Sequence, residues 1–229
     1  MVRSLLILII SFNVFSKENL NEEVFKQLVE LIESDSATQS FIISNDNEVV
    51  HEYYGDGYTR DDLATSWSIS KTFYAALFGV AIEKGLISYS DLQKPISFFI
   101  PELIEDSKSQ LTLYNLLAMR SGLEITEYLN EEMFFSIDNL DFAMNAQPAM
   151  PQGEIYEYNN VNTMLLNPII KSIFKEEPHN VLIKEIFDPL GIDRYGLWSD
   201  SAGNDMTYYG IDLMPRDFLK FANLFMNNG

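Results

Sequence analysis

The sequence predicts a fold of the α/β class, in which strands and helices share one domain. Three observations predict it. Residues 40–44 and 48–54 are two short strand-like runs around Asn45-Asp46-Asn47, which is a hairpin signal. Residues 91–190 have a mainly helical pattern that prolines and glycines interrupt. The 229 residues are 47% apolar and 21% charged, a globular composition long enough for one domain.

The remaining elements follow from apolar spacing. Residues 20–33 carry apolar side chains at helical spacing, and residues 68–84 are apolar on most sides, which predicts a buried helix ending at Gly85. A last apolar helix begins with Pro215 and runs to Asn228. A two-stranded sheet is marginally stable alone, and this helix needs a sheet to cover. We therefore expect the late sheet strands to be missing from this chain, as in the N-terminal part of a longer protein.

The N-terminus resembles an export signal. Arg3 precedes an apolar stretch, residues 5–15, and Val14 and Ser16 fit positions −3 and −1 of a cleavage site. We expect a signal peptide over residues 1–16 and an exported protein, periplasmic or extracellular, with no stable membrane span after cleavage. An uncleaved anchor and a buried N-terminal helix are the alternatives.

Composition excludes several classes of function. Aspartate and glutamate number 34 against 15 lysines and arginines, and a net charge of −19 repels phosphate backbones, so no nucleic-acid partner is expected. The absence of cysteine excludes a cysteine nucleophile, disulfides and cysteine-ligated metals. His51 and His179 have no metal-binding motif around them, so we expect no histidine-built metal site; an all-carboxylate calcium or magnesium site stays open.

Residues 68–71 read Ser-Ile-Ser-Lys, an S-x-x-K motif. On a helix Ser68 and Lys71 share a face, so the amine reaches the hydroxyl. The apolar residues 73–78 supply burial, which lowers a lysine pKa enough for the amine to act as a base. If Ser68 lies at the helix N-terminus, its own N–H is free to face a developing oxyanion.

Other serines fit this chemistry less well. Ser66 and Ser70 project from other faces of the helix than Lys71. The S-x-x-K spacing recurs at residues 172–175, but there it runs into acidic residues and a proline, which indicates a solvated helix end. The context of the motif, more than its spacing, therefore favours Ser68.

Residues 158–160, Tyr-Asn-Asn, form a Y-x-N motif. Here the phenol of Tyr158 can relay a proton between nucleophile and leaving group, and the amide of Asn160 can orient a substrate. A second copy lies at residues 128–130, and a partly buried packing residue is the alternative for either tyrosine.

Together these motifs resemble the beta-lactamase-related serine hydrolases, a superfamily that includes class C beta-lactamases, penicillin-binding D-alanyl-D-alanine carboxypeptidases and esterases. Further segments are most similar to its 6-aminohexanoate-dimer hydrolase-like branch. The matching segments, in family order over roughly residues 38–229, are 68–71, 116–123, 151–160, 189–192, 198–203 and 215–218. Two parts of these, residues 121–123 and 198–203, are expected to be architectural, as a helix stop and a turn.

The resemblance implies a role for each matching position. Ser68 is the acylated nucleophile, Lys71 its general base, and Tyr158 shares the proton transfer. Asn160 falls where the family places a substrate-contacting or structural amide, and Tyr128 where some relatives carry a mobile substrate-contacting tyrosine. The implied partner is a small ester or amide, with beta-lactams, D-amino-acid peptides and short amide oligomers all compatible, and no cofactor is needed.

The resemblance also implies an α+β sandwich with an all-helical subdomain, a beta-lactamase/transpeptidase-like fold. The domain would cover residues 17–229, with the helical subdomain over about 86–200. The family's third motif, Lys- or His-x-Gly on a late strand, is absent, and its strand supplies an oxyanion donor whose loss costs about 10²–10³ in kcat. We therefore expect the chain as given to be weak or inactive.

Two other functions stay open. A non-catalytic module of the same fold would bind cell-wall peptide or a protein partner without turnover. An unrelated Ser-His-Asp hydrolase would use His51 or His179, although no G-x-S-x-G motif is present.

Overall fold

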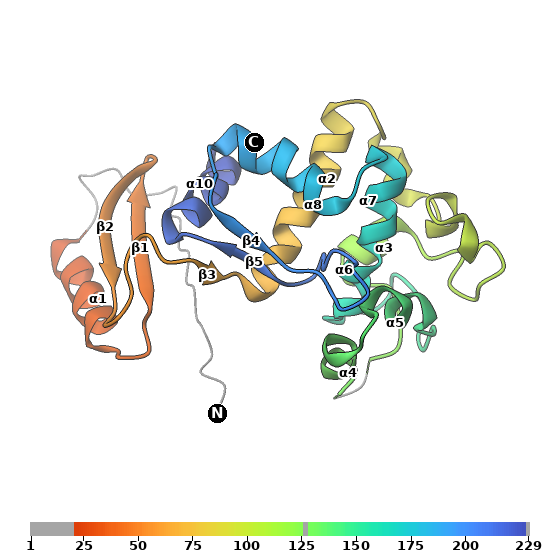
Figure 1. Ribbon diagram of the computed structural model, residues 1–229, viewed down its shortest axis with the longest axis horizontal. Helices are drawn as coiled ribbons and strands as arrows, with labels where there is room; N and C mark the ends of the chain where they lie inside the picture. Colours follow the sequence, from red (N-terminus) through yellow and green to blue (C-terminus); the bar gives the residue numbers. More distant parts are fainter. Residues whose placement is uncertain (1–20, 126–127, 228–229) are drawn as a thin grey trace. The chain divides into compact units, whose positions relative to one another are not determined.

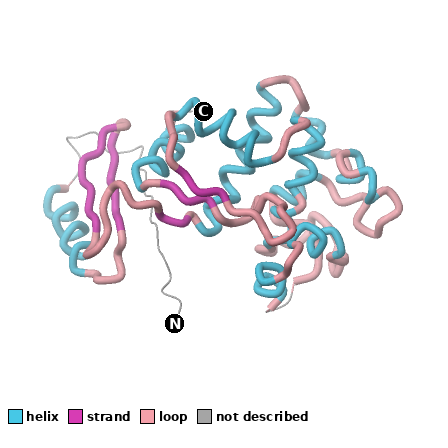
Figure 2. The backbone as a smooth tube through the Cα atoms, in the orientation of Figure 1, coloured by secondary structure: helices cyan, strands magenta, loops and turns pink. Residues whose placement is uncertain are grey.

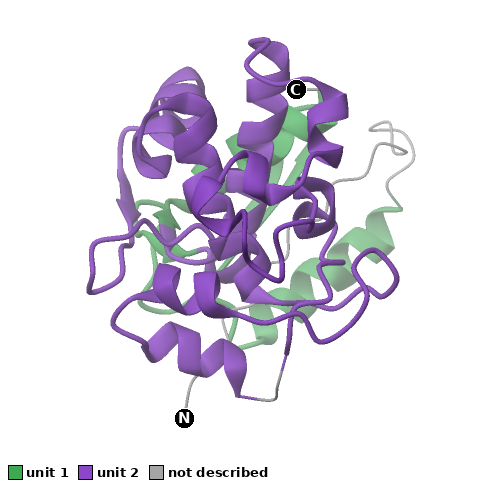
Figure 3. Cartoon of the chain, turned by 90° about the vertical axis from the view of Figure 1, so that its right-hand side faces the viewer, with its two compact units in different colours: residues 1–65, 212–229 green, residues 66–211 purple. Residues whose placement is uncertain are grey.

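The computed structural model of the chain describes residues 21–125 and 128–227. The expected signal peptide, residues 1–16, lies outside the described residues. The chain divides into two compact units: unit 1 takes the residues up to 65 and those from 212 onward, and unit 2 is residues 66–211 (Figure 3). Strands and helices occur together, which confirms the α/β prediction (Figure 2). Within the described part of the chain, no helix combines the length and apolar character needed to cross a membrane.

Unit 1 begins with α1 (Glu22–Ser34), close to the helix predicted over residues 20–33. The Asn21 side chain caps it by accepting hydrogen bonds from the backbone amides of Glu23 and Val24. Acidic residues in the first turn suit the positive end of the helix dipole.

The predicted hairpin is present in unit 1. The strands β1 (Ser40–Asn45) and β2 (Glu48–Tyr54) pair antiparallel. The register runs from Ser40 opposite Tyr54 to Asn45 opposite Glu48. Between the strands, Asp46 and Asn47 both have positive φ, 50° and 66°. A type I′ turn needs positive φ at both central residues, and Asn and Asp tolerate it well, so these two residues set the hairpin.

The last helix belongs to unit 1 as well. The helix α10 (Pro215–Met226) packs against β1, and it is tied to the hairpin near both of its ends. Arg216 makes two hydrogen bonds to the Glu52 carboxylate, 2.8 and 2.9 Å long. Beyond the other end, the Asn227 amide donates to the Asn47 side chain at 3.1 Å. The expected end of this helix, Asn228, lies outside the described residues.

A second antiparallel pair joins the two chain segments of unit 1. The strand β3 (Ala64–Thr65) pairs with β5 (Ile211–Leu213), with Ala64 opposite Leu213 and Thr65 opposite Asp212. The boundary between the units falls inside β5, directly after Ile211.

Unit 2 is built around α2 (Ser70–Glu83), which a 3₁₀ turn, Trp67–Ile69, precedes (Figure 1). Gly85 ends this region in the left-handed conformation, φ 67°, as the sequence predicts. The helix packs against α7 (Leu166–Phe174) and α8 (Pro178–Leu182). Its buried apolar side chains are Phe73, Tyr74, Leu77, Phe78 and Ala81. The run of apolar residues that predicted a buried helix is therefore the core of unit 2.

The rest of unit 2 consists of short helical segments and loops, because prolines, glycines and polar caps interrupt the pattern every few residues. Three 3₁₀ segments come first: Tyr89–Gln93, Ile96–Phe98 and Pro101–Leu103. Short helices follow: α3 (Leu113–Leu117), α4 (Leu129–Phe135), α5 (Asn139–Asn145) and α6 (Asn160–Met164). After α8 come a π-helical turn (Ile183–Phe187), α9 (Asp188–Leu190) and the strand β4 (Tyr195–Leu197).

Candidate active site

Ser68 lies in the 3₁₀ turn that leads into α2, and its side chain is exposed. Its backbone N–H has no hydrogen-bond acceptor among the described residues, as expected at the start of a helix. The residue before it, Trp67, has φ 47°, a conformation that non-glycine residues rarely adopt. The turn therefore presents Ser68 to solvent and leaves its amide without an acceptor among the described residues.

Lys71 lies one helical turn after Ser68 and is 8% exposed. Its Nζ donates to Ser68 Oγ at 3.1 Å and to the main-chain carbonyl of Tyr208 at 2.9 Å. The aromatic rings of Tyr158 and Tyr208 lie 5.0 and 5.7 Å from Nζ. Burial lowers the pKa of Lys71 from 10.5 to about 7. At neutral pH a large fraction of this amine therefore has a lone pair to accept the serine proton.

Tyr158 completes a group of three around one oxygen. Its hydroxyl donates to Ser68 Oγ at 2.6 Å, and its side chain is partly exposed. Burial raises the pKa of Tyr158, the hydrogen bond to Ser68 lowers it, and Tyr156 raises it further, with a net rise above 10.0. The phenol is therefore protonated at neutral pH and serves as a donor. Ser68, Lys71 and Tyr158, which the sequence analysis singled out, thus lie in hydrogen-bond contact.

Two other serines hold the turn and stay out of this group. Ser66 and Ser70 are buried, and their hydroxyl oxygens lie 2.6 Å apart. Both accept from the backbone amide of Ile211, at 3.2 and 3.3 Å, and the Ser70 hydroxyl lies 2.8 Å from the Trp67 carbonyl, to which it donates. They fix the path of the chain on both sides of Ser68, which agrees with the expectation that they project elsewhere.

The segment before Tyr158, residues 153–157, is hydrogen-bonded to residues 119 and 120, which follow α3. The backbone amides of Gly153 and Glu157 donate to the carbonyls of residues 120 and 119, at 2.8 and 2.9 Å. Gly122 has φ 70°, and a Cβ there would overlap the Met150 carbonyl oxygen, so only glycine fits. The Ser-Gly-Leu segment thus acts as architecture that sets the place of Tyr158.

Asn160 and Tyr128 lie in different surroundings. The backbone amide of Asn160 donates to the Asn130 side-chain oxygen at 3.1 Å, so the two Y-x-N motifs are in contact. The Asn160 Oδ1 is buried and has no hydrogen-bond partner among the described residues. Tyr128 precedes α4 and is 59% exposed, and no hydrogen bond links it to Ser68. The neighbouring Asn159, which had no assigned role, caps α6 and donates to the Glu124 carbonyl.

The second S-x-x-K copy lies at the end of α7. Lys175 is the residue after the helix, in the left-handed conformation with φ 61°, and no hydrogen bond joins it to Ser172. The expectation of a helix end therefore holds for this copy.

The sequence did not identify Tyr208, whose carbonyl is the second acceptor for the Lys71 amine, or the residues that bond to Tyr208. Tyr208 is buried, and its hydroxyl donates to Asn139 Oδ1 at 2.6 Å. The Asn139 backbone amide in turn donates to Asp200 Oδ2 at 2.8 Å. These bonds hold the side chain of Tyr208, while its main-chain carbonyl accepts from the amine of Lys71. Nothing in the sequence marks a main-chain carbonyl, so no local signal identifies it.

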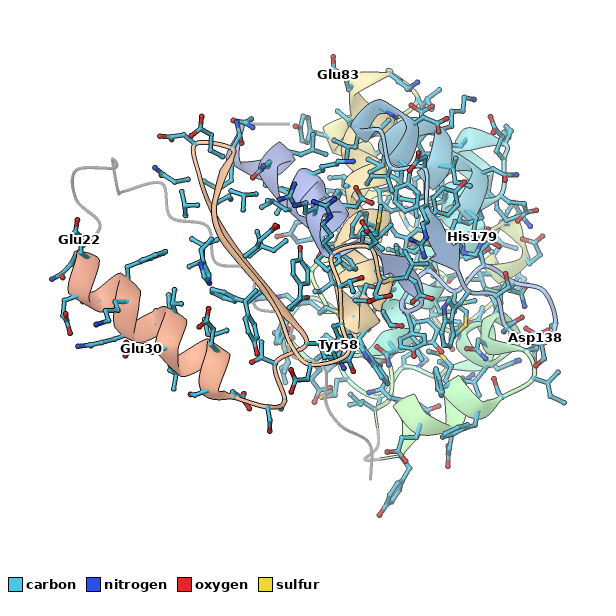
Figure 4. All side chains as sticks on the ribbon, turned by 60° about the vertical axis from the view of Figure 1, so that its left-hand side comes forward. Glu22, Glu30, Tyr58, Glu83, Asp138 and His179 are labelled. Atoms are coloured by element: carbon cyan, nitrogen blue, oxygen red, sulfur yellow. The ribbon has the colours of Figure 1, made fainter. Side chains whose placement is uncertain are left out.

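The two histidines lie elsewhere. His51 Nε2 is 3.6 Å from Glu33 Oε1 within unit 1. His179, labelled in Figure 4, pairs with Asp205 at 2.9 Å between Nδ1 and Oδ1 within unit 2, and its Nε2 is buried without a partner among the described residues. Neither imidazole bonds to the hydroxyl of a described serine in its own unit. No cluster of three or more metal-ligating side chains occurs over residues 21–125 and 128–227.

Comparison with known proteins supplies a family for this arrangement. The family model described as Beta-lactamase matches residues 22–228. A 6-aminohexanoate-dimer hydrolase of Paenarthrobacter ureafaciens is 21% identical over an alignment of 213 residues that covers 85% of this chain and 53% of that protein. The chain thus spans about half the length of this curated relative.

Solved structures share the fold. A Bacillus anthracis protein provisionally described as a 6-aminohexanoate-dimer hydrolase superposes with a TM-score of 0.76 at 22% identity, over 89% of this chain and 57% of that one. A class C beta-lactamase variant superposes with a TM-score of 0.68 at 21% identity, over 89% and 65% of the two chains. The predicted beta-lactamase/transpeptidase-like fold is therefore confirmed.

Proposed function

Because the chain belongs to the beta-lactamase family, we propose that it is a serine hydrolase that cleaves an ester or amide through an acyl-enzyme on Ser68. The observation that carries the proposal is the position of one oxygen, Ser68 Oγ, within 3.1 Å of Lys71 Nζ and 2.6 Å of the Tyr158 hydroxyl. An exposed hydroxyl between a buried amine of lowered pKa and a protonated phenol is an activated nucleophile.

In acylation, Ser68 Oγ attacks the carbonyl carbon and its proton passes to the neutral amine of Lys71. The free N–H of Ser68 donates to the oxyanion that forms. The bond from carbon to the leaving group breaks, and Lys71, directly or through the Tyr158 hydroxyl, returns the proton to the departing alcohol or amine. Water then attacks the acyl group, the same groups move its proton, and the acid leaves Ser68 free.

The substrate class follows from this chemistry and from the named relatives. Ester and amide carbonyls both accept a serine nucleophile, and beta-lactams, D-amino-acid peptides and short amide oligomers are the candidates. We place Asn160 and Tyr128 among the groups that contact substrate. The exposed ring of Tyr128 is available for packing against a substrate, whereas Asn160 is assigned by its place in the Y-x-N motif, since its unpartnered Oδ1 is buried. Raised KM values in Asn160→Ala and Tyr128→Ala, with acylation retained, are the expected results.

Covalent labelling tests the nucleophile. A fluorophosphonate should add to one residue, Ser68, with formation of the Oγ–P bond and loss of fluoride, and peptide mass spectrometry should locate it. Ser68→Ala should abolish labelling, whereas the matched variant Ser172→Ala, in the second S-x-x-K copy, should label normally. Labelling that persists in Ser68→Ala would show that the nucleophile is wrong.

The same experiment separates the alternatives. Binding of a cell-wall peptide without any adduct on Ser68 would favour the non-catalytic module. Labelling that survives changes at Lys71 but is lost with His51→Ala or His179→Ala would favour a histidine-dependent hydrolase.

We also propose that the protein is exported and that residues 1–16 are its signal peptide, on the charge and apolar pattern of that stretch. The mature protein recovered from a secreting host should then begin at Lys17. An intact N-terminus on cytoplasmic protein would contradict this proposal.

A further inference from the structure

The conformation of Trp67 is unusual for its residue type. Its φ of 47° lies in the left-handed region, which glycine enters without penalty and a bulky side chain does not. The backbone of this turn would therefore be served better by glycine. Residues in strained backbone conformations cluster at functional sites. The indole is therefore expected to contribute something at this position that glycine would not.

The indole belongs to a group of four aromatic side chains, Trp67, Phe134, Trp198 and Tyr209, which we call the aromatic wall. Tyr209 lies at its centre and is buried, with ring centroids 5.0 Å from Trp67, 5.1 Å from Phe134 and 5.3 Å from Trp198. All three contacts are edge-to-face, the favoured geometry for aromatic pairs. Trp67 and Trp198 remain 43% and 39% exposed, so the wall presents apolar surface to solvent.

The wall is joined to the nucleophile at two points. Trp67 directly precedes Ser68, and Tyr209 directly follows Tyr208, whose carbonyl accepts from Lys71. The indole thus belongs to the residue next to the nucleophile, where a group bonded to the carbon that Ser68 attacks can meet it.

The wall continues into a cavity in unit 2. Phe134, Trp198 and Met206 line a space of about 180 Å³ together with the polar residues Ser136, Asn139, Ser199, Asp200 and Ser201. An apolar cavity of about 150 Å³ holds a benzene molecule, so this space has room for a phenyl ring or a short alkyl chain against its three apolar residues. The charged lining residue, Asp200, has both carboxylate oxygens occupied by hydrogen bonds from its own loop and from Asn139.

We propose that Trp67 determines specificity: with the aromatic wall it binds an uncharged alkyl or aryl group attached to the carbonyl that Ser68 attacks. This inference rests on the proposed serine hydrolase function. The wall buries methylene or ring carbons next to the reacting centre, and each fully buried methylene raises the rate constant of acylation by about fourfold.

Fluorophosphonates that differ only in an ethyl, hexyl or decyl chain test this specificity on the full chain. Their reaction forms the Ser68 Oγ–P bond, expels fluoride and passes the serine proton to Lys71. The second-order rate constant for the hexyl probe should exceed that for the ethyl probe by roughly 10- to 100-fold, since the added methylenes are partly buried.

Trp67→Gly should lower the preference for hexyl over ethyl at least fivefold, because the indole surface that buries the longer chain is removed. Trp67→Phe should keep most of the preference, because a ring remains. Tyr89→Gly, which removes an exposed aromatic outside the wall, is the matched control and should change nothing. Circular dichroism verifies that each variant is folded.

The outcomes are distinct. An unchanged chain-length preference in folded Trp67→Gly overturns the role of Trp67 and leaves the hydrolase proposal intact. The missing oxyanion donor is expected to slow labelling by about 10²–10³. No labelling of Ser68 by any probe in the wild-type chain, after an incubation long enough to allow for this loss, overturns the hydrolase proposal itself.

Discussion

The lowered pKa of Lys71 makes a quantitative prediction about the pH dependence of Ser68 acylation. With a pKa of about 7 in place of 10.5, about half of the amine is neutral at pH 7. A lysine with its ordinary pKa would be neutral in roughly one molecule in three thousand. Only the neutral amine accepts the serine proton, so the rate should rise about tenfold per pH unit below pH 7 and level off above about pH 8.

The assay is the pseudo-first-order rate of fluorophosphonate addition to Ser68, followed by intact-protein mass spectrometry from about pH 5 to about pH 10. Lys71→Arg is the matched variant, since arginine keeps the positive charge and cannot deprotonate. It should lower the rate at the plateau by about 10²–10⁴ and abolish the inflection. A wild-type rate that climbs steadily through pH 9 without levelling would refute the assignment, and so would an inflection that survives in Lys71→Arg.

Three other predictions concern stability. Between pH 7 and 10.5 the unfolded chain binds a proton at Lys71 that the folded chain does not. Lys71 therefore lowers the free energy of unfolding at low pH, and this destabilisation fades as the pH rises to 10.5. Urea unfolding should show Lys71→Met to be more stable than wild type by up to about 5 kcal/mol at pH 6 and no more stable near pH 11; equal stability at pH 6 would contradict the buried charge. Gly122→Ala should lose about 2 kcal/mol or more and melt earlier in calorimetry, because its Cβ meets the Met150 carbonyl; an unchanged melting temperature would refute that contact. Tyr208→Phe should lose about 1–3 kcal/mol by leaving the buried Asn139 oxygen unpaired, yet keep the inflection near pH 7, since Lys71 bonds to the main chain; a displaced inflection would show that the phenol matters to the amine.

Local patterns predicted the local structure well. Asp46 and Asn47 are the residue types that tolerate positive φ, so the hairpin could be read from two positions. The buried helix from Ser70 and its end near Gly85 follow from apolar residues and one glycine. The contact of Ser68 with Lys71 spans a single turn of helix, and the spacing alone determines that it can form.

Contacts between distant segments were harder to predict. Tyr158 meets Ser68 across 90 positions, and the sequence indicated this only through resemblance to a known family. The carbonyl of Tyr208 could not be identified, because every residue carries a carbonyl and only the fold selects one. The φ of Trp67 has no signal in the sequence, because tryptophan is not a residue type that predicts left-handed backbone.

The division of unit 1 into two chain segments affects how the protein is made. The hairpin emerges from the ribosome early, but α10, which packs on β1 and bonds to Glu52 and Asn47, follows only after the whole of residues 66–211. At bacterial or eukaryotic rates of about 5–20 residues per second, the hairpin waits for roughly ten to thirty seconds with an uncovered face. Unit 2 is one continuous segment and can fold during that interval. During that interval the nascent hairpin presents unpaired strand edges, which a chaperone can keep from pairing with another chain.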